Sequence, residues 1–251
     1  MNITDSYNAS QANVMLGQIY SRQISVTPTE STKEVDKIKK AFESADLRVQ
    51  QKSESTKEQI SSMGKLKSSL ADTQAASRDV QKLKPNASAA DMAADMAAAA
   101  EKMVKAYNST QKAAVNSEAQ SGSSAEASNA RRVGNDLKRS ASNGGLTSEL
   151  QKAGVSQNQD GTLKIDAEKF KAAAASDPAA LRKALEKVGQ KIEASSTKAL
   201  SDKSDLNTAL KALKDREVGL EARRVEQQTL ASTFNQKNLA MAAAYRSNAT
   251  S

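Results

Sequence analysis

Residues 145–185, GLTSELQKAGVSQNQDGTLKIDAEKFKAAAASDPAALRKAL, carry the strongest fold signal in the chain. Leu146 and Leu150 are four residues apart, which places them on one face of a short helix. Gly154 follows where a helix ending in the left-handed conformation is expected. The remainder alternates as a short extended run, a turn and a second extended run, so the stretch predicts a helix, a β-hairpin and further helix.

The loop length of this hairpin fixes which residues face each other. A two-residue loop would put Val155 and Ile165 on opposite faces of the ribbon. A three-residue loop over 159–161, with its glycine at positive φ, instead pairs Val155 with Ile165 and Gln157 with Leu163. We therefore predict the three-residue loop, because it keeps the apolar side chains on one face.

Polar residues that suit helix starts follow the hairpin. Asp166 is expected to cap the next helix, with Glu168 in its first turn, and Asp177-Pro178 to cap and begin the helix after that. The residues expected to define this hairpin module are Gly154, Val155, Asp160, Gly161, Leu163, Ile165 and Phe170.

The module resembles the C-terminal part of the flagellar hook-associated protein 2 family, the filament cap. The matching residues are Leu150, Gly154, Val155, Asp160, Gly161, Thr162, Leu163, Asp166, Phe170, Asp177 and Pro178. Ala153 departs from the pattern, since the family has Leu or Ile there. Upstream, KMVKAYN at 102–108 resembles a family helix that ends in a Tyr-Asn pair, and 61–70 resembles its first long helix.

The resemblance covers about residues 33–190 and implies a structural role. It implies a cap that oligomerises with itself at the distal end of the flagellum and helps incoming flagellin to insert. Flagellin or hook-filament junction proteins and an export chaperone are the implied partners. Typical caps carry two outer domains between the first helix and the Tyr-Asn helix, whereas only Pro85–Ala90 separates them here. The chain thus resembles a short form that lacks the outer domains.

Composition argues against a thick globular core. Leu, Ile, Val and Phe number 40 of 251 residues, below the roughly 20% at which packed domains become hard to build. Net charge is only +8, and the mixture of Ala, Lys, Glu, Gln and Leu favours helix. We therefore predict an all-α fold, an elongated antiparallel helical bundle or coiled coil with one small β-hairpin in its middle third.

A heptad runs through the first half of the chain and weakens at Lys52, Thr56 and Gln59. It predicts one long helix over 31–84 that ends before Pro85. The apolar positions of this stripe are Val35, Ile38, Phe42, Met63, Leu66, Leu70 and Val80.

A second stripe lies in a long C-terminal helix predicted over 191–246, and consists of Leu206, Leu210, Leu213 and Leu220. Chains bury their own faces first, so most stripe residues are expected to pack within the chain. Because apolar residues are scarce, some are expected to meet other subunits. Aspartate at Leu66 or Leu213 is therefore expected to abolish assembly and leave the hairpin module folded.

The remaining segments are shorter. Residues 1–30 and 247–251 are expected to be loosely ordered, and 85–190 to form a middle helical module. Within that module, an alanine-rich helix is expected over 87–118, a loop over 117–128 and a short basic helix over 130–141. Tyr107 is expected to pack its ring in a helix seam and to keep its hydroxyl in water.

No catalytic, cofactor or metal site is predicted. The chain has no Cys and no His, which excludes disulfides, thiol nucleophiles and imidazole catalysis. Asp160-Gly161 lacks the alternating ligands of a calcium loop. No cleaved signal peptide and no membrane helix is predicted, so export would use an uncleaved N-terminus, as the resemblance implies.

Two other classes of protein remain open at this stage. An intracellular coiled-coil scaffold or secretion chaperone would share the heptads without needing the hairpin module. A nucleic-acid-binding protein could use the basic cluster Arg131, Arg132, Lys138 and Arg139 with Arg223 and Arg224. Acidic residues interleave with this cluster, so a solvated face or ion pairs between subunits are the preferred interpretation.

Overall fold

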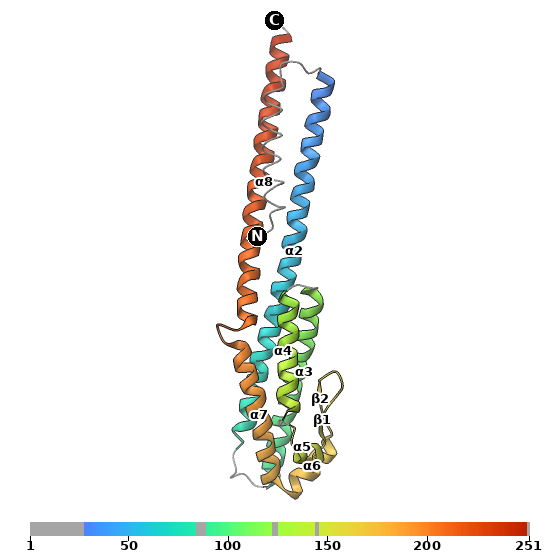
Figure 1. Cartoon of the computed structure of the whole chain (residues 1–251), viewed down its shortest axis with the longest axis vertical. Helices are drawn as coiled ribbons and strands as arrows, with labels where there is room; N and C mark the ends of the chain where they lie inside the picture. The colour runs from blue at the N-terminus through green and yellow to red at the C-terminus, as the bar shows by residue number, and fades with distance from the viewer. Residues whose placement is uncertain (1–27, 84–88, 122–124, 144–145, 250–251) are drawn as a thin grey trace. The chain divides into compact units, whose positions relative to one another are not determined.

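Helices account for nearly the whole of the described chain. A computed structural model describes residues 28–83, 89–121, 125–143 and 146–249 (Figure 1). The elements are α2 Pro28–Gln81, α3 Ala89–Ser121, α4 Ala125–Ser142, α5 Ser148–Lys152, β1 Val155–Gln157, β2 Leu163–Ile165, α6 Ala167–Ser176, α7 Pro178–Leu200 and α8 Asp205–Ala249. The predicted fold class, all-α with one small hairpin, is confirmed. Residues 1–27 and the predicted break at Pro85 lie outside the described residues.

The hairpin has the predicted three-residue loop. β1 and β2 pair antiparallel, with Val155 opposite Ile165 and Gln157 opposite Leu163. Gly161 closes the turn with φ +89°, and its N–H donates to the Asn158 carbonyl over 3.0 Å. Thr162 donates through both its N–H and its hydroxyl to Asp160 Oδ1, and these bonds lower the pKa of Asp160. The local turn chemistry therefore sets the register that the sequence predicts.

The helix starts after the hairpin are also as predicted. Asp166 accepts a hydrogen bond from the Lys169 N–H over 3.1 Å and caps α6. Asp177 accepts one from the Ala180 N–H over 2.9 Å and caps α7, with Pro178 as the first helical residue. Each cap satisfies a backbone donor that the first turn of a helix leaves without an internal partner.

The prediction of a continuous helix over 191–246 is wrong. α7 ends at Leu200 and α8 begins at Asp205. Ser204 Oγ accepts a hydrogen bond from the Asn207 N–H, which caps α8, while Asn207 Nδ2 donates to the carbonyls of Leu200 and Ser201. Side-chain hydrogen bonds from Ser and Asn compete with the helical ladder, and here they replace it at 201–204 without any Gly or Pro.

Two predictions for the middle of the chain need correction. α3 extends to Ser121 and α4 starts at Ala125, so most of the loop expected over 117–128 is helical. α4 is longer than the basic helix expected over 130–141, because it has an apolar face at helical spacing. The buried residues of that face include Ala127, Ala130, Val133, Leu137 and Ala141.

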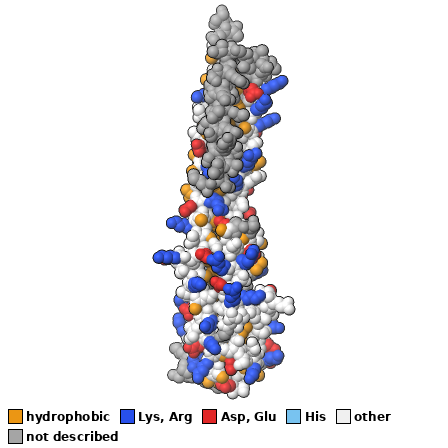
Figure 2. Space-filling model, viewed as in Figure 1, with side chains coloured by type: hydrophobic (Ala, Val, Ile, Leu, Met, Phe, Trp, Pro, Cys, Tyr) orange, Lys and Arg blue, Asp and Glu red, His pale blue; other side chains and the backbone are white. Residues whose placement is uncertain are grey.

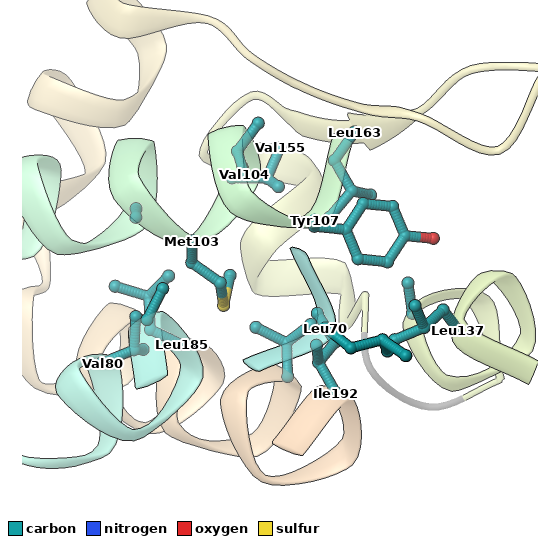
Figure 3. Packing of buried hydrophobic residues seen from close by; sticks show 14 of the residues in the cluster. Leu70, Val80, Met103, Val104, Tyr107, Leu137, Val155, Leu163, Leu185 and Ile192 are labelled. Atoms are coloured by element: carbon teal, nitrogen blue, oxygen red, sulfur yellow. The ribbon is translucent and has the colours of Figure 1, made fainter. Parts of the chain in front are cut away.

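The chain divides into two compact units. Of the described residues, 28–51 and 221–249 form unit 1, and those between 52 and 220 form unit 2. Unit 2 contains α3 to α7, the hairpin, and the adjoining parts of α2 and α8. Its core draws one or more apolar side chains from each of these elements, as Figure 3 shows for Leu70, Leu137 and Ile192 of α2, α4 and α7.

Unit 1, by contrast, is a pair of helices. Its described part consists of the α2 segment before residue 52 and the α8 segment after residue 220, which run antiparallel (Figure 1). The rings of Phe42 and Phe234 lie against each other with centroids 5.9 Å apart. Among the described apolar residues of unit 1, only Val49 and Phe234 are buried. Two helices with so few buried side chains gain little free energy from packing against each other.

Candidate assembly site

The adjacent residues Tyr107 and Asn108 of α3 hold the hairpin against this helix through hydrogen bonds. The Tyr107 side chain is fully buried, and its hydroxyl donates to the Gly161 carbonyl over 3.0 Å. The same hydroxyl accepts from the side-chain amides of Gln111 and Gln157, each over 3.2 Å. The expectation of a hydroxyl in water is therefore wrong: the hairpin turn covers it and supplies its acceptor.

Asn108 completes the attachment at the outer edge of β2. Its Nδ2 donates to the Leu163 carbonyl and its Oδ1 accepts from the Leu163 N–H, both over 2.7 Å. A side-chain amide thus takes the place of a neighbouring strand at this residue, satisfying an edge that would otherwise be open to pairing. Lys138 of α4 adds a hydrogen bond of 2.9 Å from Nζ to the Gln159 carbonyl.

Sequence reasoning found this pair only through the family resemblance and missed its partners Gln111 and Gln157. A glutamine four residues after a seam tyrosine was the available signal, because residues i and i+4 lie next to each other on a helix. Gln157 could not be found in this way, since it reaches the hydroxyl from the hairpin, 50 residues along the chain.

Burial of Tyr107 predicts a stability change at alkaline pH. Desolvation raises the pKa of Tyr107 to about 12, with a further contribution from the charge of Asp160, while the two glutamine amides oppose the shift. Because the folded-state pKa is raised, folding favours the neutral phenol. The native state keeps this stability below pH 10 and loses it as the pH rises from 10 to 12. A rise of this size in the pKa corresponds to roughly 3 kcal/mol.

The measurement is urea unfolding between pH 8 and 12 of the wild type and of Tyr107→Phe. At pH 8 the variant should be less stable by about 1–3 kcal/mol, because the Gly161 carbonyl and two amides lose a partner. The difference in free energy of unfolding between the two proteins should become smaller as the pH approaches 12, since the variant has no phenol to ionise. This difference does not contain the contribution of the lysines that titrate in the same range, because both proteins have them. A difference that stays constant across this pH range would contradict the predicted coupling between ionisation of Tyr107 and folding.

The stripe residues predicted from the heptads separate into two groups. Met63, Leu66, Leu70 and Val80 are buried in the core of unit 2, as are Leu206, Leu210 and Leu213 of α8. Leu220 is also buried but lies outside that core cluster. These side chains are covered by the chain's own helices. Val35, Ile38 and Phe42 lie in unit 1 and are only half-buried. Of the predicted stripe, these three therefore retain surface that a second subunit could cover.

A groove in unit 1 lies beside Phe42 and Phe234 and has a volume of about 700 Å³. Charged residues of α2 and uncharged polar residues of α8 form much of its lining. Asp46 Oδ1, Gln227 Oε1 and Asn238 Nδ2 border it and are buried without a hydrogen-bond partner. Buried polar atoms are nearly always paired in native structures, so the site has unused hydrogen-bonding capacity.

Two arginines of the basic cluster form ion pairs within the chain. Arg131 pairs with Glu118 over 2.6 Å, and Arg132 pairs with Asp205. Arg216, which the sequence did not single out, pairs over 3.1 Å with the buried carboxylate of Glu126. Blue and red side chains are interspersed on the described surface in Figure 2. These three ion pairs lie within the chain. The sequence had favoured a solvated face or ion pairs between subunits for this cluster.

Neither a membrane helix nor a metal cluster is found in the described residues. None of the described helices combines the length and the apolar composition needed to span a bilayer. The described carboxylates do not gather in groups of three or more that could hold a metal ion.

Comparison with known proteins places the chain in a family. The model of the flagellar hook-associated protein 2 C-terminus matches residues 80–247, which is more than half of the chain and includes the Tyr-Asn pair, the hairpin and most of α8. Searches of curated proteins and of solved structures returned no match. The family is structural rather than enzymatic. From the matched residues and the folded hairpin module, we conclude that the chain belongs to the flagellar hook-associated protein 2 family.

Proposed function

We propose that this protein is an exported axial component of the bacterial flagellum that assembles as an oligomer at the end of an axial structure and assists filament assembly. The observation that carries the proposal is the family match over residues 80–247. The proposed partners are further copies of the chain and other axial proteins such as flagellin or hook-filament junction proteins, with an export chaperone before secretion.

The fold supports a mechanical rather than a catalytic role. Unit 2 has a full core, whereas the described part of unit 1 buries only Val49 and Phe234 among its apolar residues. Helices of this kind become fully stable only when neighbours cover them, which couples their ordering to assembly. We propose that unit 1 supplies subunit contacts, including those of Val35, Ile38 and Phe42, and that unit 2 holds the hairpin module in place.

The short connection between α2 and α3 bears on where the protein acts. Only residues 82–88 separate the two helices, so the outer domains typical of caps do not stand between them. We propose a cap reduced to its helical part, which caps the filament or a shorter axial structure.

The test is fractionation with a specific antibody in wild-type cells and in a mutant that lacks the flagellar export gate. We expect the protein in sheared flagella and culture supernatant of the wild type, and its loss from both fractions in the mutant. A cytosolic enzyme serves as the control for lysis. Confinement to the cytosol in both strains would refute the axial role and favour an intracellular scaffold or secretion chaperone.

A further inference from the structure

The heptad of α7 continues into α8 without a change of count. Counting in sevens gives six positions that are all buried or partly buried: Leu185, Ile192, Ala199, Leu206, Leu213 and Leu220. The non-helical residues 201–204, which we call the junction, lie between the third and fourth of these positions. A constant count of seven is the pattern of one uninterrupted helix, because helical residues seven apart share a face. The junction therefore interrupts a pattern that specifies a single helix.

The residues of the junction are themselves compatible with helix. They are Ser, Asp, Lys and Ser, each of which a helix accommodates at small cost. The first three are exposed, so packing does not hold them in the non-helical form. The N–H groups of Asp202 and Lys203 have no acceptor among the described residues and are left to water. In a continuous helix they would donate to the carbonyls of Lys198 and Ala199.

Asn207 keeps the two helices apart by occupying acceptors that a continuous helix needs. Its Nδ2 donates to the carbonyls of Leu200 and Ser201 over 3.0 Å and 2.9 Å. In a continuous helix these carbonyls would accept from the N–H groups four residues later, those of Ser204 and Asp205. The side-chain amide thus competes directly with the helical hydrogen bonds across the junction.

The start of α8 has a second attachment, from α4. Arg132 forms an ion pair with the Asp205 carboxylate, and Asn129 Nδ2 donates to the Asp205 carbonyl over 3.4 Å. The side chains of the ion pair are 62% and 55% exposed. Exposed pairs of this kind hold two groups together only weakly. The attachment can therefore be released without disturbing the buried core.

We propose that the junction is a conformational switch, at which α7 and α8 join into one continuous helix when the bonds of Asn207 and Arg132 are released. The junction projects as a loop beside the two helices, and α8 continues in the direction of α7 (Figure 1). Four residues of helix add about 6 Å of length and slightly more than one turn, so the buried face of α8 returns to nearly the same direction. One-turn shifts of packed elements are a recurrent form of switching. The switch requires no partner protein, so it can be tested independently of the proposed axial role.

The experiment measures the length across the junction by double electron–electron resonance on the full-length chain. Spin labels are attached to Lys191→Cys and Lys214→Cys, which are exposed positions in a chain that has no cysteine of its own. In a continuous helix the 23 residues between them would separate the Cα atoms by about 35 Å. Asn207→Ala combined with Arg132→Ala, the release variant, should lengthen the wild-type distance towards this value by up to about 6 Å.

Hydrogen exchange at the junction provides a second readout. The amides of Asp202 and Lys203 should exchange at least about tenfold more slowly in the release variant than in the wild type, because joining gives them acceptors. Arg139→Ala is the matched control, since Arg139 is an exposed arginine of α4 that forms no ion pair in the described residues. It should leave both readouts at their wild-type values. Adding Lys203→Pro to the release variant should restore the wild-type distance, because proline has no N–H to donate.

The outcomes decide between a switch and a fixed break. Wild-type distance and exchange rates in the release variant would overturn the proposal. A longer distance that Lys203→Pro does not reverse would show that α8 moves without joining α7, which also overturns it. A loss of helix content by circular dichroism in the release variant would mean that Asn207 and Arg132 stabilise the helices instead of keeping them apart, and the proposal would again be wrong.

Discussion

Leu66→Asp should unfold unit 2. Leu66 is fully buried in the cluster that also contains Leu163 of the hairpin and Phe170 of α6. Removing a buried leucine side chain costs about 2–5 kcal/mol, and an ionised carboxylate without a partner adds a comparable amount. The sum, about 5 kcal/mol or more, approaches the whole stability of an ordinary domain. The sequence-based expectation that the hairpin module would stay folded is therefore revised, since it shares this core.

The measurement is urea unfolding followed by circular dichroism, with hydrogen exchange at β1 and β2 as a separate report on the hairpin. Val115→Asp is the matched control, because Val115 lies on α3 in the same unit and is 62% exposed. Its effect should stay within about 0.5 kcal/mol. If the hairpin amides of Leu66→Asp stay protected from exchange, the hairpin folds independently of the core that contains Leu66, and the prediction that both unfold together is wrong.

Gly154→Ala should be the second most damaging substitution, with a loss of about 3 kcal/mol. Gly154 has φ +82°, a conformation that costs a residue with a side chain roughly 1–2 kcal/mol. An added Cβ would also lie 2.7 Å from the Asp166 Cβ and 3.0 Å from the Lys169 Cβ. These Cβ atoms belong to the cap and the first turn of α6, so they can move away from the added methyl group only if the backbone of α6 moves. The Gly154 carbonyl also accepts from the Asp166 N–H over 3.1 Å, and that bond would be strained as well.

Gly161→Ala separates the two causes of this loss. Gly161 has a similar φ of +89°, but the nearest atom to an added Cβ is the Lys138 Cδ at 2.9 Å, in a long side chain that can turn away. We expect about 1–2 kcal/mol for Gly161→Ala, which includes loss of the Lys138 hydrogen bond to the Gln159 carbonyl if that side chain turns away. The difference between the variants is therefore a lower limit for the cost of the backbone clash. Both free energies come from urea unfolding at pH 7. Equal losses would mean that the positive φ explains the whole effect and the contact with α6 none of it.

The hairpin region could be predicted in detail because its determinants are local. The Asp160-Gly161 turn, the alternation from Val155 to Ile165 and the caps at Asp166 and Asp177 each act over a few residues. The break at 201–204 is just as local, yet it went unpredicted. Its signal is a set of hydrogen bonds in which Ser204 Oγ accepts from the Asn207 N–H and Asn207 Nδ2 donates to the Leu200 carbonyl. Neither Ser nor Asn ends a helix unless the geometry of its neighbours allows such bonds.

The helical class, the hairpin register and the positions of the stripes could be predicted from the sequence, because composition, turn chemistry and heptad period act along the chain. Which stripe residues the chain covers itself depends instead on tertiary packing. It places Leu66 and Leu213 in one core and leaves Val225 and Leu239 exposed, although all four occupy helical stripes. It also decided the surroundings of Tyr107, whose acceptor at Gly161 is 54 residues away. The period of a single helix determines the face on which a side chain lies, but it does not determine which other helix packs against that face. Burial depends on that second factor.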